Sequence, residues 1–337
     1  MDIGSSAVKA VQLDRTGPAV SLKALGVVEL PPGAISEGTI HDLAAVVDAI
    51  QHAVSKAGIK TTDAAIGICG RELMIKKLQI PEVPARELPE AVHLEAEHQI
   101  PFAIDEVFLD YHVLGQQDRV LELALVAAKK TKVTEYANAV QEAGLSPVVV
   151  DVDGFALGNQ FEMNAPEETG LVALVDIGAT MMKINVVRGG TTLFVRDVPF
   201  GGNRYTETIA ARLKIPFAQA EAAKLGREGG FALEALAPVR DAVSRELALE
   251  LQRAFDYFAS TAATEQISKM VLAGGTSKLV GLREYLGSTF GVPVEVVKPF
   301  EHVQVAPEHA QEVAAAGPSL AVAVGLGLRQ PGDSAKR

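Results

Sequence analysis

The fold is decided by two copies of one motif, DIGSSAVK at residues 2–9 and DIGATMMK at residues 176–183. Asp, Ile, Gly and Lys recur at the same spacing, and small or hydroxyl residues fill the two positions after each glycine. About half of the chain separates the copies, which indicates a duplicated structural unit. The repeat therefore predicts two related lobes, each of which presents one acidic hairpin to the other.

Each copy carries groups that suit a metal-bound polyphosphate. Gly4 and Gly178 lack a Cβ atom, so the backbone can approach a phosphate closely, and the N–H groups of such a turn can donate to phosphate oxygens. Asp2 and Asp176 are expected at strand ends, where they can hold a hydrated Mg²⁺, usually through water. The remaining predicted phosphate ligands are Ser5, Ser6, Thr180 and Lys9.

Two alternatives stay open for these motifs. Asp-Ile-Gly is a common strand-to-turn signal when it occurs once, and only the repetition favours a phosphate site. Lys183 ends the second copy as Lys9 ends the first. It is either a second phosphate ligand or the outward-facing residue of a strand.

The composition indicates a globular protein with more than one domain. A chain of 337 residues exceeds one ordinary core, and 48% hydrophobic with 22% charged residues is typical of globular chains. The net charge of −11 argues against nucleic acid as a partner, because binding its backbone requires a basic face. The same charge is compatible with a partner that has a basic tail.

Cysteine and histidine usage argues against several kinds of site. The single cysteine, Cys69, excludes an internal disulfide and a cysteine-based metal cluster, and it fits a reducing compartment. His93 and His98 miss the i, i+4 spacing of a helical metal pair. The sequence contains no apolar run of about 18 residues, so it predicts no membrane span. We expect a cytoplasmic protein.

Predicted strands and helices alternate, which indicates an α/β architecture. Residues 228–230 are expected to form a loop tip. Strands are expected at residues 7–13, 20–30, 64–69, 171–175, 183–187, 192–198, 270–273 and 294–297. Helices are expected at residues 43–54, 201–213, 217–225, 237–264 and 278–290.

The pattern changes between residues 71 and 151, where short strands and charged helices alternate. This segment carries no nucleotide motif, so we interpret it as an inserted α+β subdomain with a role in interaction. Its strands are expected at residues 74–80, 107–114, 120–128 and 148–150, and its helices at 87–99 and 131–143.

A third motif, AGGTS at residues 273–277, links an expected strand to an expected helix. The backbone at Gly274, Gly275 and Thr276 could pack against a purine, and a helix start suits an anion. The motif is neither G-x-G-x-x-G nor G-x-x-x-x-G-K-[ST]. Rossmann and Walker sites therefore lack their residues here.

The order of these three motifs resembles that of the actin-like ATPase superfamily. The segments GGNRYTETIA from residue 201 and AEAAK from residue 220 look like the Gly-Gly…Ala-Glu-x-x-Lys segment of FtsA-type members. The resemblance implies that Gly202 belongs to the nucleotide site and that Glu221 and Lys224 contact the ribose. Without it, these last two residues would be interpreted as a weak i, i+3 surface ion pair.

Within that superfamily the chain resembles the PilM family of type IV pilus assembly proteins. The resemblance covers essentially the whole chain, including the position of the insertion. FtsA ends in a membrane-targeting helix after a linker, and the lack of such an end here favours PilM. The segments that carry the resemblance are residues 2–11, DVDGFAL at 151–157 and GPSLAVAVGL at 317–326.

The resemblance implies an actin-like ATPase fold, with two lobes around a nucleotide cleft and an FtsA-like inserted α+β subdomain in the first lobe. We expect the insertion at residues 71–151 and a small helical subdomain at about 214–266 of the second lobe. The first lobe is expected at residues 1–70, 152–168 and 318–330, and the second at 169–317.

The resemblance also implies ATP and Mg²⁺ as ligands and PilN as a partner. The cytoplasmic N-terminal segment of PilN would bind in a groove by the first lobe and the insertion, which would link the cytoplasmic motors to the inner membrane. A peripheral position at the cytoplasmic face of that membrane follows. Pilus motor ATPases, the platform protein and a second copy of the chain are further partners that it allows.

Hydrolysis is a separate matter, because it requires a group that orients the attacking water. Asp153 and Gln160, with Asp151, are the candidates, although each is equally a residue of a strand or helix that joins the lobes. We expect ATP binding with slow or no hydrolysis. The alternatives are a sugar kinase or polyphosphate hydrolase of the same fold, or an FtsA-like filament-forming protein.

The beginning of the chain is unusual for this motif. The apolar run LVALV at residues 171–175 precedes the second copy, whereas only Met1 precedes the first. A central strand should lead into Asp2 as it does into Asp176. We therefore expect the natural protein to extend beyond Met1 at its N-terminus.

Overall fold

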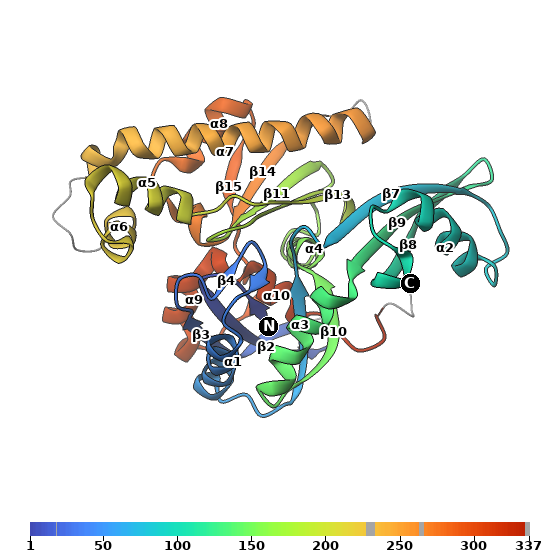
Figure 1. Ribbon diagram of the computed structural model, residues 1–337, viewed down its shortest axis with the longest axis horizontal. Coiled ribbons are helices and arrows are strands. Elements are labelled where there is room, and N and C mark those ends of the chain that lie inside the picture. The colour runs from blue at the N-terminus through green and yellow to red at the C-terminus, as the bar shows by residue number, and fades with distance from the viewer. Residues whose placement is uncertain (18, 227–232, 263–265, 334–337) are drawn as a thin grey trace.

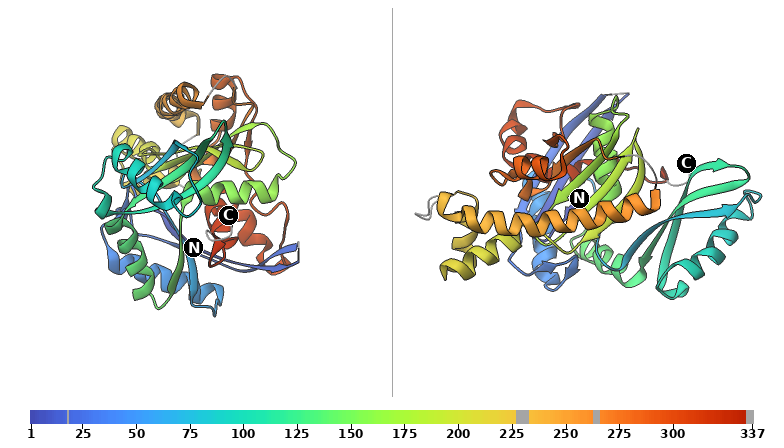
Figure 2. Two further views of the ribbon diagram at one scale, coloured as in Figure 1. Left: turned by 90° about the vertical axis from the view of Figure 1, so that its right-hand side faces the viewer. Right: turned by 90° about the horizontal axis from the view of Figure 1, so that it is seen from above.

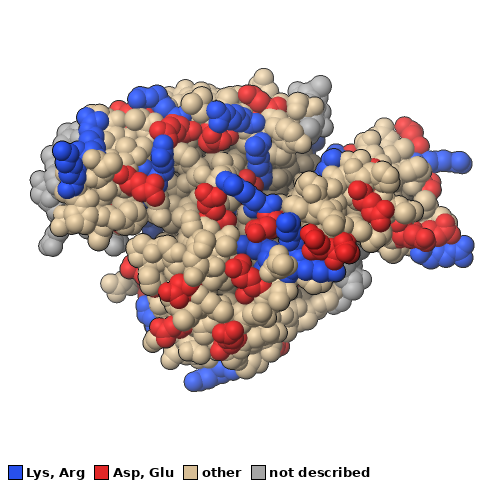
Figure 3. All heavy atoms as spheres, in the orientation of Figure 1, with Lys and Arg blue, Asp and Glu red and all other residues tan. Residues whose placement is uncertain are grey.

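The computed structural model describes residues 1–17, 19–226, 233–262 and 266–333, and it has the predicted two-lobed α/β architecture. In Figure 1 the first lobe lies below the second, and a smaller subdomain projects to one side. Figure 2 shows that subdomain standing off one end of both lobes. Acidic and basic side chains are interspersed over the face shown in Figure 3.

The first lobe is built on two sheets that lie edge to edge. One has the strand order β1-β2-β3-β16, and the other pairs β6 with β10 in parallel. The Met1 nitrogen donates to Ala65 O of β6 at 2.7 Å, so β1 and β6 are neighbours. The strands are β1 Asp2–Ile3, β2 Ala7–Thr16, β3 Ala19–Glu29, β6 Asp63–Ile68, β10 Ser146–Val152 and β16 Val303–Gln304.

The second lobe repeats this arrangement in a single sheet of order β13-β12-β11-β14-β15. The first lobe has the matching sequence of neighbours, β3-β2-β1-β6-β10, which confirms the related lobes that the motif repeat predicts. Every residue of β11 is buried, as expected for a central strand. The strands are β11 Leu171–Ile177, β12 Met182–Arg188, β13 Thr191–Val198, β14 Lys269–Ala273 and β15 Val294–Val296.

Helix α1, Leu43–Ala57, shows why its sequence forms a helix at this position. The Asp42 side chain accepts a hydrogen bond from Ala45 N at 3.0 Å and caps the first turn. Gly58 ends the helix in the left-handed conformation that favours glycine, with φ 66°. The buried face between these caps packs against β2 and β3.

Four helices cover the second lobe, and α7 lies along its outer side in Figure 1. The helix expected at 278–290 is wrong in its first turn, because a short 3-10 helix and Gly281 at φ 82° precede α8. The loop expected at 228–230 and the last residues of the helix expected at 237–264 lie outside the described residues. The elements are α5 Asn203–Leu213, α6 Phe217–Lys224, α7 Leu233–Ala262, η2 Gly275–Lys278 and α8 Leu282–Phe290.

The inserted subdomain has a three-stranded sheet of order β7-β9-β8 and a helix, α2, with a core of their own. Helix α3 contributes instead to the core of the first lobe, and β10 pairs with β6. We therefore propose residues 73–129 as the extent of the insertion. The elements are β7 Leu73–Pro81, α2 Leu88–Gln99, η1 Ile104–Glu106, β8 Val107–Gln117, β9 Val120–Lys129 and α3 Lys130–Glu142.

Two helices, α4 Asp153–Asn164 and α10 Ala321–Gly327, pack together between the lobes. A Cβ atom on Gly325 would lie 1.8 Å from Ala156 O, so only glycine permits this approach. No helix among the described residues is long and apolar enough to cross a membrane. The remaining elements are β4 Ile35–Ser36, β5 Thr39–Ile40, η3 Pro307–His309, α9 Ala310–Ala316 and η4 Gly317–Leu320.

Candidate nucleotide-binding site

Both motif copies form hairpins of the same design. Asp2 pairs with Lys9 across β1 and β2, and Asp176 pairs with Lys183 across β11 and β12. Directly paired residues project from the same face of a sheet. The ammonium groups therefore reach their own aspartates, at 2.6 Å in the first hairpin and 2.9 Å in the second.

The turns of the hairpins also match. Gly4 N donates to Ala7 O at 3.1 Å, and Gly178 N donates to Met181 O at 2.9 Å. Both turns thus close through the same glycine of the motif, which follows the aspartate by two positions. The repeated sequence therefore encodes one local structure twice.

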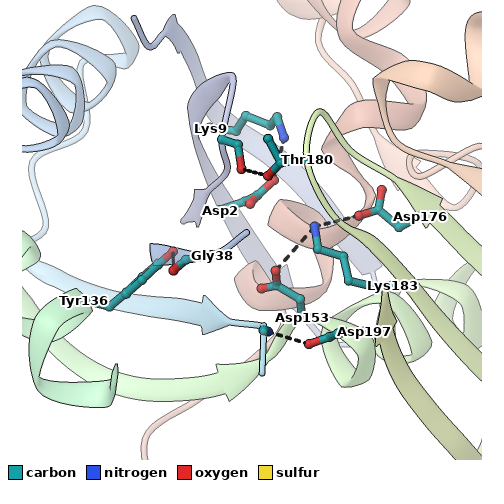
Figure 4. A network of polar contacts seen from close by, with 11 residues as sticks. Asp2, Lys9, Gly38, Tyr136, Asp153, Asp176, Thr180, Lys183 and Asp197 are labelled. Carbon is teal, nitrogen blue, oxygen red and sulfur yellow. Dashed lines mark hydrogen bonds and ion pairs between the residues drawn. The ribbon is translucent and has the colours of Figure 1, made fainter. Parts of the chain in front are cut away.

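Lys183 is an inward-facing residue, so its interpretation as an outward strand residue is wrong. Only 7% of it is exposed, and its Nζ also lies 3.5 Å from a carboxylate oxygen of Asp153 at the start of α4 (Figure 4). Burial opposes the charged ammonium, but Asp176 and Asp153 outweigh it and hold the pKa of Lys183 well above its ordinary value.

Asp153 and Asp2 are both buried near Lys183, but their pKa values shift in opposite directions. Burial raises the pKa of Asp153, and the nearby Asp2 and Asp176 charges add to that effect, so its pKa lies above the ordinary value. Burial acts in the same direction on Asp2, yet Lys9 and Lys183 outweigh it and lower the pKa of Asp2. Asp2 is therefore the better-stabilised anion of the pair.

The two hairpins touch across the boundary between the lobes. The hydroxyl oxygens of Ser5 and Thr180 are 2.6 Å apart and share a hydrogen bond. Glu37 N also donates to the Thr180 hydroxyl, at 3.2 Å. These contacts place Ser5 and Thr180, both predicted phosphate ligands, opposite one another.

The turn between β4 and β5, which carries Glu37, is held by hydrogen bonds from two buried side chains of helix α3. Tyr136 donates to Gly38 O at 2.8 Å (Figure 4). The buried Lys132 ammonium donates to the same oxygen. Sequence analysis missed both side chains, because they lie on α3 within the segment assigned to the insertion. The sequence indicated only that the two residues lie four positions apart in an expected helix, and therefore on the same face of it.

Asp197 is a further acidic residue of the site that sequence analysis missed. It lies beside Lys183, with which it is paired across β12 and β13 (Figure 4). It also accepts a hydrogen bond from Gly70 N of the first lobe at 2.7 Å. Burial raises the pKa of Asp197 to about 7, against the opposing effect of the Gly70 N–H. The corresponding partner of Lys9 in the first lobe is Val27, so the motif repeat gives no signal for Asp197.

The AGGTS loop lies directly against the second hairpin. Gly274 has φ 82°, and a Cβ atom there would lie 2.4 Å from Ile177 O, so the loop requires glycine at this point. The Thr276 hydroxyl donates to Gly178 O at 3.1 Å. Gly275 faces open space. The predicted purine loop and phosphate hairpin are therefore parts of one surface.

Glu221 and Lys224 lie at the same place, on α6. Lys224 Nζ is 2.7 Å from the Glu221 carboxylate and donates to Gly202 O at 3.3 Å. A Cβ atom on Gly202 would lie 2.5 Å from the Thr276 hydroxyl. The pair thus borders the glycine loops and is more than a surface ion pair, since the Lys224 side chain is only 9% exposed.

The three candidates for water activation lie in different surroundings. Asp153 contacts Lys183 within the site. Gln160 is fully buried two turns further along α4, about 10 Å along the helix axis. Its amide atoms have no hydrogen-bond partner among the described residues. Asp151 forms an ion pair with Arg329 near the C-terminal end.

These residues fit a metal-bound polyphosphate. The hairpins offer paired hydroxyls and two ammonium groups, and glycine stands where Cβ atoms would collide with the backbone or with Thr276. Among the described residues no three His, Cys, Asp or Glu side chains are grouped to hold a metal ion. Asp2 and Asp176 would hold Mg²⁺ only together with phosphate oxygens and water.

The comparison with known families decides the assignment. The family profile of type IV pilus assembly protein PilM matches residues 1–331. The chain belongs to the PilM family. A solved PilM–PilN type IV pilus biogenesis complex is similar to it with a TM-score of 0.87 and 33% identity, covering 97% of this chain and 96% of that one.

More distant sequence relatives of the chain are cell division proteins. Cell division protein FtsA of Neisseria meningitidis serogroup B is 22% identical over 89% of this chain and 83% of its own length. For FtsA of Bacillus subtilis the identity is 24%, over 66% of this chain and 56% of that protein.

Two further solved structures share the fold. EutJ of Carboxydothermus hydrogenoformans has a TM-score of 0.59 at 17% identity, covering 97% of this chain and 87% of that one. MreB5 of Spiroplasma citri, bound to ADP, has a TM-score of 0.53 at 13% identity, covering 96% and 93%. The chain therefore has the actin-like ATPase fold, with an FtsA-like inserted subdomain.

Proposed function

We propose that this PilM-family chain is an ATP-binding scaffold of the type IV pilus machine, and that it docks the cytoplasmic N-terminal segment of PilN. The observation that carries the proposal is a large groove beside the inserted subdomain. Its cavity volume is about 1430 Å³, and β7, β8, β9, β10, α4 and β13 all contribute to its walls. We call it the partner groove.

The partner groove presents apolar side chains that the rest of the chain leaves uncovered. Phe108 of β8 is 50% exposed and Val148 of β10 is 42% exposed. Tyr257 of α7 and Phe194 of β13 face them from the second lobe. A concave surface with large exposed apolar side chains is typical of a protein or peptide docking site.

The charges of the groove suit a basic segment. Lys77 is paired with Glu122, and Arg329 is paired with Asp151. Among the described residues, the acidic lining residues Glu95, Asp110 and Glu162 have no salt bridge, and against them stands one cation without a salt bridge, Lys76, which donates to Gln99. Segments next to a membrane span on the cytoplasmic side are enriched in Lys and Arg, so PilN supplies the complementary charge.

ATP with Mg²⁺ is proposed to bind between the hairpins and to shift the balance between two lobe positions. Direct contacts such as Ser5–Thr180 and Asp197–Gly70 hold one position, and a bound polyphosphate would favour another. A ligand shifts such a balance only by its different affinity for the two states. The nucleotide thereby acts on the partner groove, which has walls from both lobes.

We propose binding without fast hydrolysis. Lys183 Nζ lies 3.5 Å from an Asp153 carboxylate oxygen and occupies the position that a water molecule would need there. Gln160 lies about two helical turns from Asp153. The proposed position is the cytoplasmic face of the inner membrane, reached through PilN. Pilus motor ATPases, the platform protein and self-association stay predictions.

The proposal is tested by calorimetric titration of a PilN N-terminal peptide into the protein. Phe108→Asp should weaken peptide binding by about tenfold or more, because it places a charge at an apolar contact. Leu249→Asp, at a 58% exposed position on α7 outside the groove, is the matched control. Equal peptide affinity for wild type and Phe108→Asp contradicts docking at this groove.

The same preparation distinguishes the enzyme alternatives. Phosphate release and sugar phosphorylation are measured with ATP, Mg²⁺ and a panel of sugars. Fast transfer to a sugar or to water, with no binding of the peptide, would overturn the scaffold proposal in favour of an actin-fold enzyme. Tight peptide binding with negligible turnover supports the scaffold.

A further inference from the structure

One strand of the second lobe belongs to both sites. The first residues of β13, Thr191 to Phe194, line the partner groove. Asp197, near the end of the same strand, lies among the carboxylates of the nucleotide site. Strand β13 is paired with β12 from Thr191 to Val198, with a register shift at Leu193, so one strand connects the two sites.

Strand β7, which forms the opposite wall of the groove, begins three residues after the residue that Asp197 contacts. Gly70 follows β6 and immediately precedes the insertion, and Leu73 N at the start of β7 donates to Gly70 O at 3.2 Å. Strand β7 then lines the groove from Leu73 to Gln79. The hydrogen bond from Gly70 N to Asp197 at 2.7 Å therefore joins the segment that leads into β7 to the end of β13, and both strands line the groove.

Gly70 is restricted at this position. Its φ of 114° lies in a region that side chains rarely adopt, and a Cβ atom would lie 3.1 Å from Glu37 O. Glu37 in turn donates its N–H to the Thr180 hydroxyl. The backbone at Gly70 is thus packed directly against the turn that reaches the phosphate hairpin.

On its own side, Asp197 belongs to a row of charged side chains across three strands. The strand register places Asp176, Lys183 and Asp197 side by side on β11, β12 and β13. Among the described residues the second carboxylate oxygen of Asp197 has no hydrogen-bond partner. Asp197 is therefore held by one hydrogen bond from Gly70 N and by electrostatic attraction to Lys183.

We propose that Asp197 is a positioning residue that couples the nucleotide site to the partner groove, through its hydrogen bond to Gly70. The inference rests on the proposed function, because it specifies how the docking site of that scaffold is regulated. A polyphosphate between the hairpins attracts the Lys183 ammonium. This changes the electrostatic attraction between Lys183 and Asp197, the last residue of the row Asp176, Lys183 and Asp197. The Asp197–Gly70 contact, and with it the separation of β7 and β13, then differs between the nucleotide-bound and nucleotide-free states.

The test is a thermodynamic cycle. Peptide dissociation constants are measured by calorimetry with and without ATP and Mg²⁺, for wild type, Asp197→Ala and Asp197→Asn. The ratio of the two constants is the coupling factor, which is typically about 5–150-fold in coupled systems. Asp241→Asn on the exposed side of α7 is the control.

We expect a coupling factor of about fivefold or more in wild type and in the control. It should fall to about one in Asp197→Ala when ATP is present at a concentration that saturates this variant, so that a change in ATP affinity does not enter the ratio. Asp197→Asn keeps a carbonyl oxygen for the Gly70 N–H and should retain part of the coupling. Melting curves show that each variant is folded, and loss of stability alone leaves the ratio unchanged.

Two results overturn the coupling proposal: a wild-type factor of about one, or an unchanged factor in Asp197→Ala. Failure of wild type to bind either ATP or the peptide contradicts the proposed function instead, so the two failures are distinguishable. Hydrogen exchange supplies an independent readout, because the Gly70 amide should exchange at different rates in nucleotide-bound and nucleotide-free wild type.

Discussion

The Ser5 and Thr180 hydroxyl oxygens lie 2.6 Å apart, and each belongs to the turn of a different hairpin. The contact joins residues from the two copies of a repeated motif across the boundary between the lobes. Hydroxyls that now bind each other are free to bind phosphate oxygens once a nucleotide separates them.

Thr180→Val removes the hydroxyl but keeps the shape of the side chain. It removes a donor to phosphate, and a hydrogen bond to a charged group contributes about 1.5–3 kcal/mol. The ATP dissociation constant should therefore rise by about tenfold or more. Isothermal titration measures it, with the exposed Thr289→Val on α8 as the control. An unchanged constant contradicts a phosphate role for Thr180.

Lys183→Met leaves Asp176 and Asp153 buried without their cation. Breaking a buried pair on one side costs about 3–5 kcal/mol, because an uncompensated charge stays behind. Urea denaturation measures the free energy of unfolding. Lys298→Met, at a side chain 75% exposed and paired with Glu301, should cost about 1 kcal/mol or less. Similar losses for both variants would show that Lys183 does not neutralise the carboxylates.

Asp197 gives a prediction with a definite pH window. Its folded-state pKa of about 7 is raised by burial from an ordinary value of 3.8. The folded state therefore holds the Asp197 proton more tightly than the unfolded state does. This contribution to the free energy of unfolding is complete below about pH 4 and is lost as pH rises towards 7. Asp197→Asn cannot ionise and should lose less stability across this window. Parallel pH dependences of unfolding for the two proteins contradict the raised pKa.

Gly274 and Gly275 form a matched pair in one loop. Gly274→Ala forces a side chain into φ 82° and against Ile177 O, so we expect a loss of about 2 kcal/mol or more in stability. Gly275→Ala meets open space and should be nearly neutral. Thermal unfolding and ATP titration measure both variants. Equal effects at the two positions would argue against the close packing of this loop on the hairpin.

The parts of the site that a local sequence repeat encodes could be predicted. The hairpins containing Asp2 and Asp176 follow from short-range spacing, as does the AGGTS loop. The orientation of Lys183 could not be decided, because it depends on strand register and on the packing of α4 against the sheet. A polar residue in a strand has no sequence signature of burial until its carboxylate partners are known.

The residues that sequence analysis missed depend on long-range contacts. Asp197 meets Gly70 only because the lobes are stacked, and its counterpart Val27 lacks the charge that a repeat search requires. Lys132 and Tyr136 were assigned to the insertion because no change in the sequence pattern marks its proposed end near residue 129. The partner groove likewise combines segments as distant as Phe108 and Tyr257.

The carboxylates of Asp2, Asp153, Asp176 and Asp197 outnumber the ammonium groups of Lys9 and Lys183 where the lobes meet. A nucleotide entering without a cation would add negative charge to a surface that is already acidic and screened little by solvent. Such repulsion makes the divalent ion a condition of entry. Selectivity for metal-bound over metal-free nucleotide is then a property of the fold itself, set before any base or ribose is contacted.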